Sequence, residues 1–138
     1  MRPSDEIRDA LLKFYAKRTA GDAASFDELV SMEATAFIGT APGEWFADRE
    51  RLRRGFAWAV RLDAGPNPQG WAEGTVGLAA DEPAMTLPDG TAIRTRLTMF
   101  FRREDGAWKV FGYHFSAGVP DEEVEELQGR WLATDQSG

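Results

Sequence analysis

The segment 93–116 constrains the fold more than any other part of this sequence, because two runs of alternating apolar residues flank Asp105-Gly106 there. An Asp-Gly pair in this position is typical of a β-hairpin with a two-residue type I′ turn, since both central residues of that turn need positive φ. The length of the turn also sets the register of the two strands. A two-residue turn predicts that Leu97 lies opposite His114.

This register gives the predicted hairpin two different faces. We expect the more apolar face to point into the protein; it carries Thr95, Leu97, Met99, Phe101, Trp108, Val110, His114 and Ser116. The other face mixes aromatic and basic side chains: Arg94, Arg96, Phe100, Arg102, Lys109, Phe111, Tyr113 and Phe115. When both faces of an antiparallel sheet are partly apolar, each face must be shielded from water by other parts of the protein or by a partner. Aromatic residues mixed with arginine are typical of protein interfaces. The predicted partner is therefore a second copy of the chain, in a homodimer through the convex face of the sheet.

Helical signals come before the strand signals along the chain. Ser4 is a good N-cap for a helix that ends near Gly21, and Ser25 begins a capping box for a second helix. A short apolar strand follows, and Asp48 is placed to cap a third helix. From Trp71 onward the apolar period is two, as in strands. This order predicts one α+β domain over residues 1–138, with helices packed on the concave face of a curved antiparallel sheet.

Composition excludes several classes of function. The net charge of −7 leaves no basic stripe that would neutralise nucleic-acid phosphates, and the arginines within 49–54 are predicted to form a solvated helix face. No apolar run reaches the ~20 residues of a membrane span. One histidine and no cysteine do not make a zinc site, so we expect no metal and no cofactor. Without a signal-peptide pattern or cysteine, the predicted location is cytoplasmic.

Two segments resemble a known family. The sequence from Phe37 to Trp45 (Phe-Ile-Gly-Thr-Ala-Pro-Gly-Glu-Trp) is similar to the strand and loop of SnoaL-like proteins in the nuclear transport factor 2-like superfamily. The segments 96–110, 114–116 and 119–120 resemble the terminal hairpin of those proteins. The resemblance implies a cystatin-like, cone-shaped α+β barrel with a pocket between the concave sheet and the helices, and pairing through the convex face. Because the superfamily hosts isomerases, cyclases, dehydratases and binding domains, the resemblance does not fix an activity.

The predicted pocket contains few groups suited to chemistry. His114 is the candidate acid–base group, with Glu44 or Tyr15 as a polar partner, because histidine titrates near neutral pH. Trp45 is expected in the loop above the pocket, and Trp58 at the rim of the pocket or at the dimer contact. The apolar hairpin face is expected to form the wall of the pocket. A lone histidine in an apolar layer is equally consistent with a core residue that bonds Thr95 or Ser116.

Carboxylates are missing where the resemblance would place a catalytic base. The steroid isomerases of the superfamily carry an acid on the strand after the second helix, and the cyclases carry one on the late strands. Here neither 34–40 nor 93–103 contains an acidic residue. Glu73 and Asp81 are predicted on the convex face, paired with arginines.

Two functions remain open at this point. The first is binding of an apolar small molecule, with or without cofactor-free proton transfer of the isomerase, cyclase or dehydratase type. The second is a non-catalytic dimeric module whose interior is filled by side chains. A cavity of several hundred Å³ favours the first, because ligand pockets span about 300–1,000 Å³.

Overall fold

The computed structural model describes the side chains of residues 1–134 and the backbone of residues 1–137. Four helices are present in that range: α1 (Asp5–Ala20), α2 (Phe26–Leu29), α3 (Arg49–Phe56) and α4 (Asp121–Ser137). The strands are β1 (Arg2–Pro3), β2 (Ala36–Ile38), β3 (Trp45–Phe46), β4 (Arg61–Asp63), β5 (Gln69–Glu73), β6 (Val76–Asp81), β7 (Ala84–Thr86), β8 (Ala92–Glu104) and β9 (Ala107–Ala117). From α1 to β9 the elements follow the predicted order of two helices, a short strand segment, a third helix and then the remaining strands.

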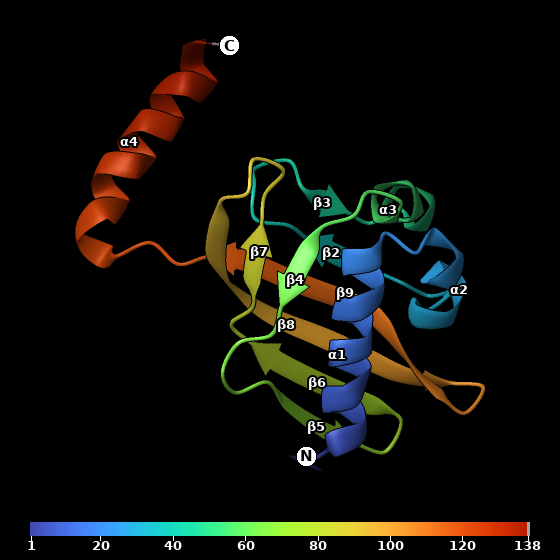
Figure 1. The fold of residues 1–138 in the computed structure, drawn as a ribbon. Coiled ribbons are helices and arrows are strands. Elements are labelled where there is room, and N and C mark those ends of the chain that lie inside the picture. The colour runs from blue at the N-terminus through green and yellow to red at the C-terminus, as the bar shows by residue number, and fades with distance from the viewer. Residues whose placement is uncertain (138) are drawn as a thin grey trace.

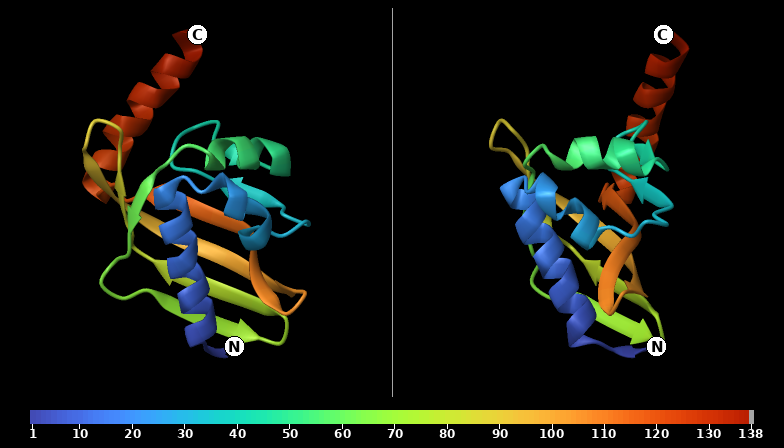
Figure 2. Two further views of the ribbon diagram at one scale, coloured as in Figure 1. Left: turned by 45° about the vertical axis from the view of Figure 1, so that its right-hand side comes forward. Right: turned by 90° about the vertical axis from the view of Figure 1, so that its right-hand side faces the viewer.

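The strands form one curved sheet with the order β1-β5-β6-β8-β9-β2-β3, and β7 adds β4 to the other end of β8 (Figure 1). All pairs are antiparallel except β2 with β9, which is parallel and places Phe37 beside Tyr113. The helix α1 crosses the concave side, and α3 lies over one end of the sheet (Figure 2). The predicted α+β class, with helices on the concave face of a curved sheet, is confirmed.

Local signals explain where the helices begin and end. The Ser4 hydroxyl accepts a hydrogen bond from the Ile7 amide at 3.3 Å, and Gly21 ends α1 in the left-handed conformation at φ 64°. Asp48 caps α3 as predicted, through the amide of Glu50 at 2.9 Å. The predicted capping box at Ser25 is wrong. Its hydroxyl bonds the Asp22 carboxylate at 2.7 Å, and a 3-10 turn, η1 (Ala23–Ser25), leads into α2.

Buried side chains between α1 and the sheet form the core. The largest are fully buried and come from both layers: Ile7, Leu11, Phe26, Phe37, Met99, Phe101 and Val110. Gly70 and Gly77 lie directly under α1, and a Cβ on Gly70 would stand 2.6 Å from the backbone nitrogen of Arg8. The close approach of helix and sheet therefore depends on glycine at this position.

The hairpin turn forms as predicted, but the register changes halfway along the strands. Asp105 and Gly106 have φ values of 51° and 78°, as a type I′ turn requires. The predicted pairing holds from Glu104–Ala107 to Phe101–Val110, where a β-bulge follows. The bulge leaves Phe111 as an extra residue in β9.

The bulge reverses the faces of the second half of β9. Leu97 pairs with Phe115 and Met99 with Tyr113, while His114 pairs with Thr98. The prediction that His114 lies on the concave face is therefore wrong. A one-residue insertion in a strand moves every later side chain to the opposite face.

A second register difference affects Asp81. The predicted two-residue turn at Asp89-Gly90 is a three-residue loop, in which the Leu87 amide donates to the Thr91 carbonyl at 2.8 Å. As a result Asp81 lies opposite Leu97 on the concave side, not on the convex face as expected. Glu73 does lie on the convex face, where it pairs with the N-terminal amine at 3.9 Å.

The helix α4 stands apart from the other elements. It follows β9 after a short linker and extends away from the sheet (Figures 1 and 2). Its first six residues, 121–126, include five acids, while Trp131 and Leu132 are exposed. No helix within residues 1–137 is long and apolar enough to cross a membrane.

Candidate functional site

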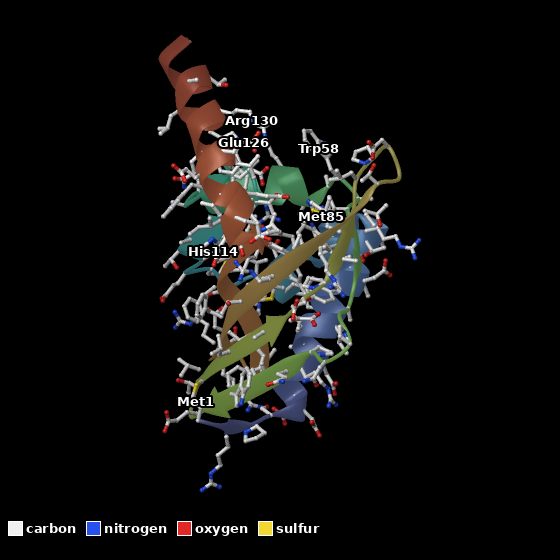
Figure 3. The ribbon with its side chains drawn as sticks, turned by 90° about the vertical axis from the view of Figure 1, so that its left-hand side faces the viewer. Met1, Trp58, Met85, His114, Glu126 and Arg130 are labelled. Atoms are coloured by element: carbon white, nitrogen blue, oxygen red, sulfur yellow. The ribbon has the colours of Figure 1, made fainter. Side chains whose placement is uncertain are left out.

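A cavity of about 730 Å³ opens at the end of the sheet beneath α3; we call it the α3 cavity. Its wall comes from α1, the β2–β3 loop, α3, β4, β7 and β9. The lining residues are Phe14, Arg18, Gly39, Thr40, Glu44, Phe46, Arg51, Leu52, Arg54, Gly55, Phe56, Trp58, Val60, Leu62, Met85, Leu87, Tyr113 and Phe115. In Figure 3, Trp58 and Met85 lie at this end of the molecule, and His114 lies apart from them.

Aromatic rings form the floor of the α3 cavity. The ring of Phe14 packs edge-on against Phe56 at 5.7 Å and against Tyr113 at 6.2 Å, and Tyr113 meets Phe115 at 5.2 Å. The bulge in β9 puts Tyr113 and Phe115 here, because without it both would point to the convex side. These edge-to-face contacts stabilise the rings and leave an apolar surface facing the cavity.

Arg18, in the last turn of α1, lies on the wall of the α3 cavity. Its Nη1 donates to the carbonyl of Phe56 at 3.3 Å and to the carbonyl of Trp58. The guanidinium also lies over the Phe56 ring, 5.3 Å from its centre. Burial lowers the pKa of Arg18. The side chain therefore holds the end of α3 in place and presents a half-buried positive charge.

The Tyr113 hydroxyl is the polar group on the aromatic floor. Burial raises the pKa of Tyr113 to about 12, the nearby positive charge of Arg18 lowers it, and the negative charge of Glu44 raises it. Among the groups that the structure describes, this hydroxyl has no hydrogen-bond partner. At neutral pH Tyr113 is thus a protonated donor available to a bound molecule.

Glu44 is held at the cavity by the tight β2–β3 loop. The Gly39 amide donates to the Glu44 carbonyl at 2.7 Å, and the Glu44 amide donates to Ala41 at 3.1 Å. Gly43 closes the loop with φ 81°. A Cβ on Gly39 would stand 2.7 Å from the Cβ of Glu44, so glycine leaves the space that the glutamate occupies.

The arginines of α3 divide into two pairs. Arg49 and Arg53 both bind the Asp27 carboxylate at 2.7 Å and hold its pKa well below the usual range. Arg51 and Arg54 line the α3 cavity instead, with Arg51 over the Phe46 ring at 4.9 Å. The predicted solvated face therefore includes one ion-paired side and one side that belongs to the cavity.

Most residues predicted to line the pocket lie elsewhere. Leu97, Met99, Phe101 and Val110 are buried in the core between α1 and the sheet. The buried Thr95 hydroxyl donates to the Pro83 carbonyl at 2.9 Å. Trp108 faces α1, where its indole nitrogen donates to Glu6 at 3.0 Å beside a second cavity of only about 60 Å³. The predicted ligand wall is therefore the packed part of the interior.

Three other predicted residues are displaced from the α3 cavity. Ser116 pairs with Arg96 and lies on the convex face with His114, a consequence of the bulge. Trp45 is 64% exposed and points away, because alternation along β3 turns Phe46 inward instead. Glu44 and Trp58 are the predicted site residues that line the cavity, and their roles stay predictions.

Tyr15 lies one residue away from the cavity wall, in a buried polar pair. Its hydroxyl donates to the Asp81 carboxylate at 3.0 Å, and the Gly65 amide donates to the same oxygen at 3.1 Å. Burial and the Asp81 charge raise the pKa of Tyr15. Asp81 is 8% exposed, and its second oxygen has no partner within residues 1–137. Neither residue of this pair lines the α3 cavity.

One signal for the missed residues was present in the sequence. Gly112 interrupts the apolar run of β9, and an isolated glycine in a strand often marks a bulge or a close backbone approach. A Cβ there would stand 2.9 Å from the Ala36 carbonyl of the parallel strand β2. A bulge predicted at Gly112 would place Tyr113 and Phe115 on the concave face of the sheet, as the structure does.

The donor set does not favour a metal. Among the described side chains, those of residues 1–134, no group of three or more histidine, aspartate or glutamate side chains is placed to hold an ion. The polar side-chain groups of the lining residues are three guanidinium groups, one carboxylate, two hydroxyls and one indole N–H. Their chemistry is hydrogen bonding, charge pairing and proton transfer.

Comparison with protein families gives a match over residues 7–121 to the SnoaL-like domain. The chain belongs to the SnoaL-like family. A search of curated protein sequences gives no match. This SnoaL-like chain shares its fold with solved structures that have little sequence identity to it, which confirms the predicted nuclear transport factor 2-like, cystatin-like fold.

Three of these structures illustrate the similarity. An NTF2-like protein of unknown function from Pseudomonas putida KT2440 has 17% identity and a TM-score of 0.70, over 85% of this chain and 87% of its own. An uncharacterised protein with a cystatin-like fold from Caulobacter vibrioides has 14% identity and a TM-score of 0.70, over 91% and 96%. A candidate dehydratase of the NTF2-like family from Streptomyces avermitilis has 15% identity and a TM-score of 0.69, over 84% and 97%.

Proposed function

We propose that this SnoaL-like protein binds a small molecule with an apolar body in the α3 cavity. The observation that carries the proposal is the cavity itself: about 730 Å³, with an aromatic and aliphatic floor and a few polar groups. Those are the usual size and composition of a ligand site. The alternative, a module with a packed interior, accounts for the core around Met99 and Phe101 but not for this volume.

A cavity-filling substitution tests the binding site. Gly55 lines the α3 cavity, and a Cβ there meets nothing within 4 Å, so Gly55→Leu fits the helix and occupies ligand space. Gly129→Leu is the matched control, because Gly129 is also a helical glycine with open space but lies in α4. The neutral fluorescent probe N-phenyl-1-naphthylamine reports apolar binding.

We expect saturable fluorescence enhancement with the wild-type protein and with Gly129→Leu. Gly55→Leu should weaken binding by about tenfold or more, since overfilling a site costs at least 1–3 kcal/mol. Equal binding by the two variants, or no saturable binding by the wild-type protein, would refute the proposal.

If the protein is catalytic, we propose cofactor-free proton transfer with Glu44 as the proton acceptor and Tyr113 as the hydrogen-bond donor. Both line the α3 cavity, and the charge of Glu44 acts on the Tyr113 hydroxyl. Isomerisation and dehydration both need a base that takes a proton from carbon and a donor that supports the oxygen. The similarity in fold to a candidate dehydratase agrees with this reaction class.

Substitution of the proposed base tests the catalytic part. On a substrate that the protein turns over, Glu44→Gln should lower kcat by ~10²–10⁴, the usual contribution of a general base. His114→Gln is the control and should leave kcat unchanged, because His114 lies on the convex face. A larger loss with His114→Gln than with Glu44→Gln would overturn the assignment.

We also propose that two copies pair through the convex face. An apolar row crosses four strands on the side that no helix covers: Trp71, Leu78, Phe100 and Phe111. Phe100 is 38% exposed, and its ring lies 6.0 Å from that of Phe111. The acidic start of α4 complements the exposed Arg94 and Arg96 of this face, which favours a second copy as the cover.

Sedimentation velocity at micromolar concentration tests the pairing. The wild-type protein should be a dimer, and Phe100→Glu should be a monomer because it places a charge within the apolar row. Leu87→Glu is a matched control, since Leu87 is similarly exposed but borders the α3 cavity. A monomeric wild-type protein would contradict the proposal.

A further inference from the structure

The charge on the wall of the α3 cavity is opposite to that of the whole chain. The protein has a net charge of −7, yet three arginines and one glutamate line the cavity. Among the side chains that the structure describes, those of residues 1–134, no carboxylate forms an ion pair with Arg18, Arg51 or Arg54. Their neighbours in α3, Arg49 and Arg53, share Asp27. The arginines that line the cavity therefore have no ion-pair partner, while the other two arginines of α3 do.

Arg18 is held in position without an anion. Its Nη1 is fixed by the carbonyls of Phe56 and Trp58, and its plane is supported by the Phe56 ring. Nε and Nη2 have no partner within residues 1–137. Neither nitrogen is among the fully buried atoms, so both donors are accessible to an oxygen ligand in the cavity. The surrounding backbone already provides the orientation that such a ligand would need.

We propose that the ligand of the α3 cavity is an apolar molecule with a carboxylate, and that Arg18 binds this group; the inference rests on the proposed binding function. The two planar oxygens of a carboxylate match the guanidinium fork better than any neutral acceptor. The Tyr113 hydroxyl donates to the same group from the cavity floor. The apolar body packs on Phe56, Phe115 and Met85.

Arg51 and Arg54 act on the approach of this anion. They line the mouth of the cavity from the exposed side of α3, and Arg51 is kept near the opening by its contact with Phe46. Positive charge at the mouth of a concave site raises the local concentration of anions and lowers that of cations. Because the rest of the protein is acidic, this local field directs anions to the α3 cavity.

A matched pair of probes tests the proposal. 2-Naphthoate and 2-naphthamide share the same apolar body and differ in the carboxylate, and each is measured by displacement of N-phenyl-1-naphthylamine at neutral pH. The wild-type protein should bind 2-naphthoate about tenfold or more tightly than 2-naphthamide, since hydrogen bonds to charged groups exceed neutral ones by this order. Arg18→Gln should abolish the preference and leave the affinity for 2-naphthamide nearly unchanged.

Further variants keep the test decisive if Arg18→Gln does not fold. Arg18→Lys retains the charge without the planar fork and should reduce the preference for 2-naphthoate over 2-naphthamide. Arg54→Gln should weaken the binding of 2-naphthoate but not of 2-naphthamide, and the remaining affinity for 2-naphthoate should depend less on salt concentration. Arg8→Gln is the control, because it removes the same charge at the far end of α1, where Arg8 is paired with Asp5 at 3.2 Å.

The outcomes separate this inference from the proposed function. Equal wild-type affinity for the two probes overturns the carboxylate assignment and leaves the apolar site intact. If Arg8→Gln loses the preference for 2-naphthoate as fully as Arg18→Gln does, the preference is a general charge effect, and the carboxylate assignment is overturned as well. Failure of both probes to displace N-phenyl-1-naphthylamine refutes the binding site itself.

Discussion

Replacing Tyr15 by phenylalanine should destabilise the protein by about 2 kcal/mol, within the range of ~1–3 kcal/mol for a buried polar group that loses its partner. The Tyr15 hydroxyl donates to Asp81 at 3.0 Å, in a region from which water is excluded. In the variant, the Asp81 oxygen that Tyr15 bonded keeps the Gly65 amide as its donor. The other oxygen of Asp81 already has no partner among the groups that the structure describes. The carboxyl would then be buried with one hydrogen bond.

Denaturant unfolding measures this loss, and thermal unfolding should show a decrease in Tm of about 6 °C for a chain of this length. Tyr113→Phe is the matched control. Its hydroxyl has no hydrogen-bond partner within residues 1–137, so the free energy of unfolding should change by less than about 0.5 kcal/mol. Equal stability of Tyr15→Phe and Tyr113→Phe would show that the pair with Asp81 does not stabilise the fold.

Three further predictions follow from burial and backbone geometry. Burial raises the pKa of both tyrosines, Tyr15 and Tyr113, so tyrosinate absorbance should appear near pH ~10 in the unfolded chain but only at higher pH in the native protein. Because the folded pKa values are the higher ones, the contribution of the two tyrosines to the free energy of unfolding should be constant below about pH 10 and fall above it. Gly106→Ala should cost about 1–2 kcal/mol in denaturant unfolding, since φ is 78° at that position. Phe101→Ala should cost about 3–5 kcal/mol, because the side chain is 1% exposed in the core.

Local signals in the sequence were sufficient to predict the fold class. Ser4, Gly21 and Asp48 each act on the backbone within a few residues, and the structure contains the caps that they predict. The Asp105-Gly106 turn likewise forms from its own two residues. Features of this kind do not depend on how distant parts of the chain pack.

The site could not be predicted in the same way, because it depends on register over long strands. One extra residue, Phe111, exchanges the faces of His114 and Tyr113, and one extra loop residue before Thr91 moves Asp81 to the interior. Both slips are small in sequence and large in their effect. Because His114 lies on the convex face and Glu44 lines the α3 cavity, Glu44 is the proposed acid–base group.

Arg18 illustrates a different limit of sequence analysis. In the sequence it is a basic residue in the last turn of a helix, where it favours the helix dipole and carries no sign of a binding role. Its significance comes from the carbonyls of Phe56 and Trp58, about forty residues later in the chain, which fix its guanidinium at the cavity. Such contacts between distant segments exist only in the folded protein.

Amide chemical-shift mapping with 2-naphthamide, the neutral probe, tests most directly the claim that the α3 cavity is the binding site. The largest shifts should occur at Gly55, Phe56 and Tyr113, which surround the cavity. The amides of Phe100 and His114 on the convex face should stay unchanged. Saturable shifts centred on Phe100 and His114, with none at the cavity, would contradict the account.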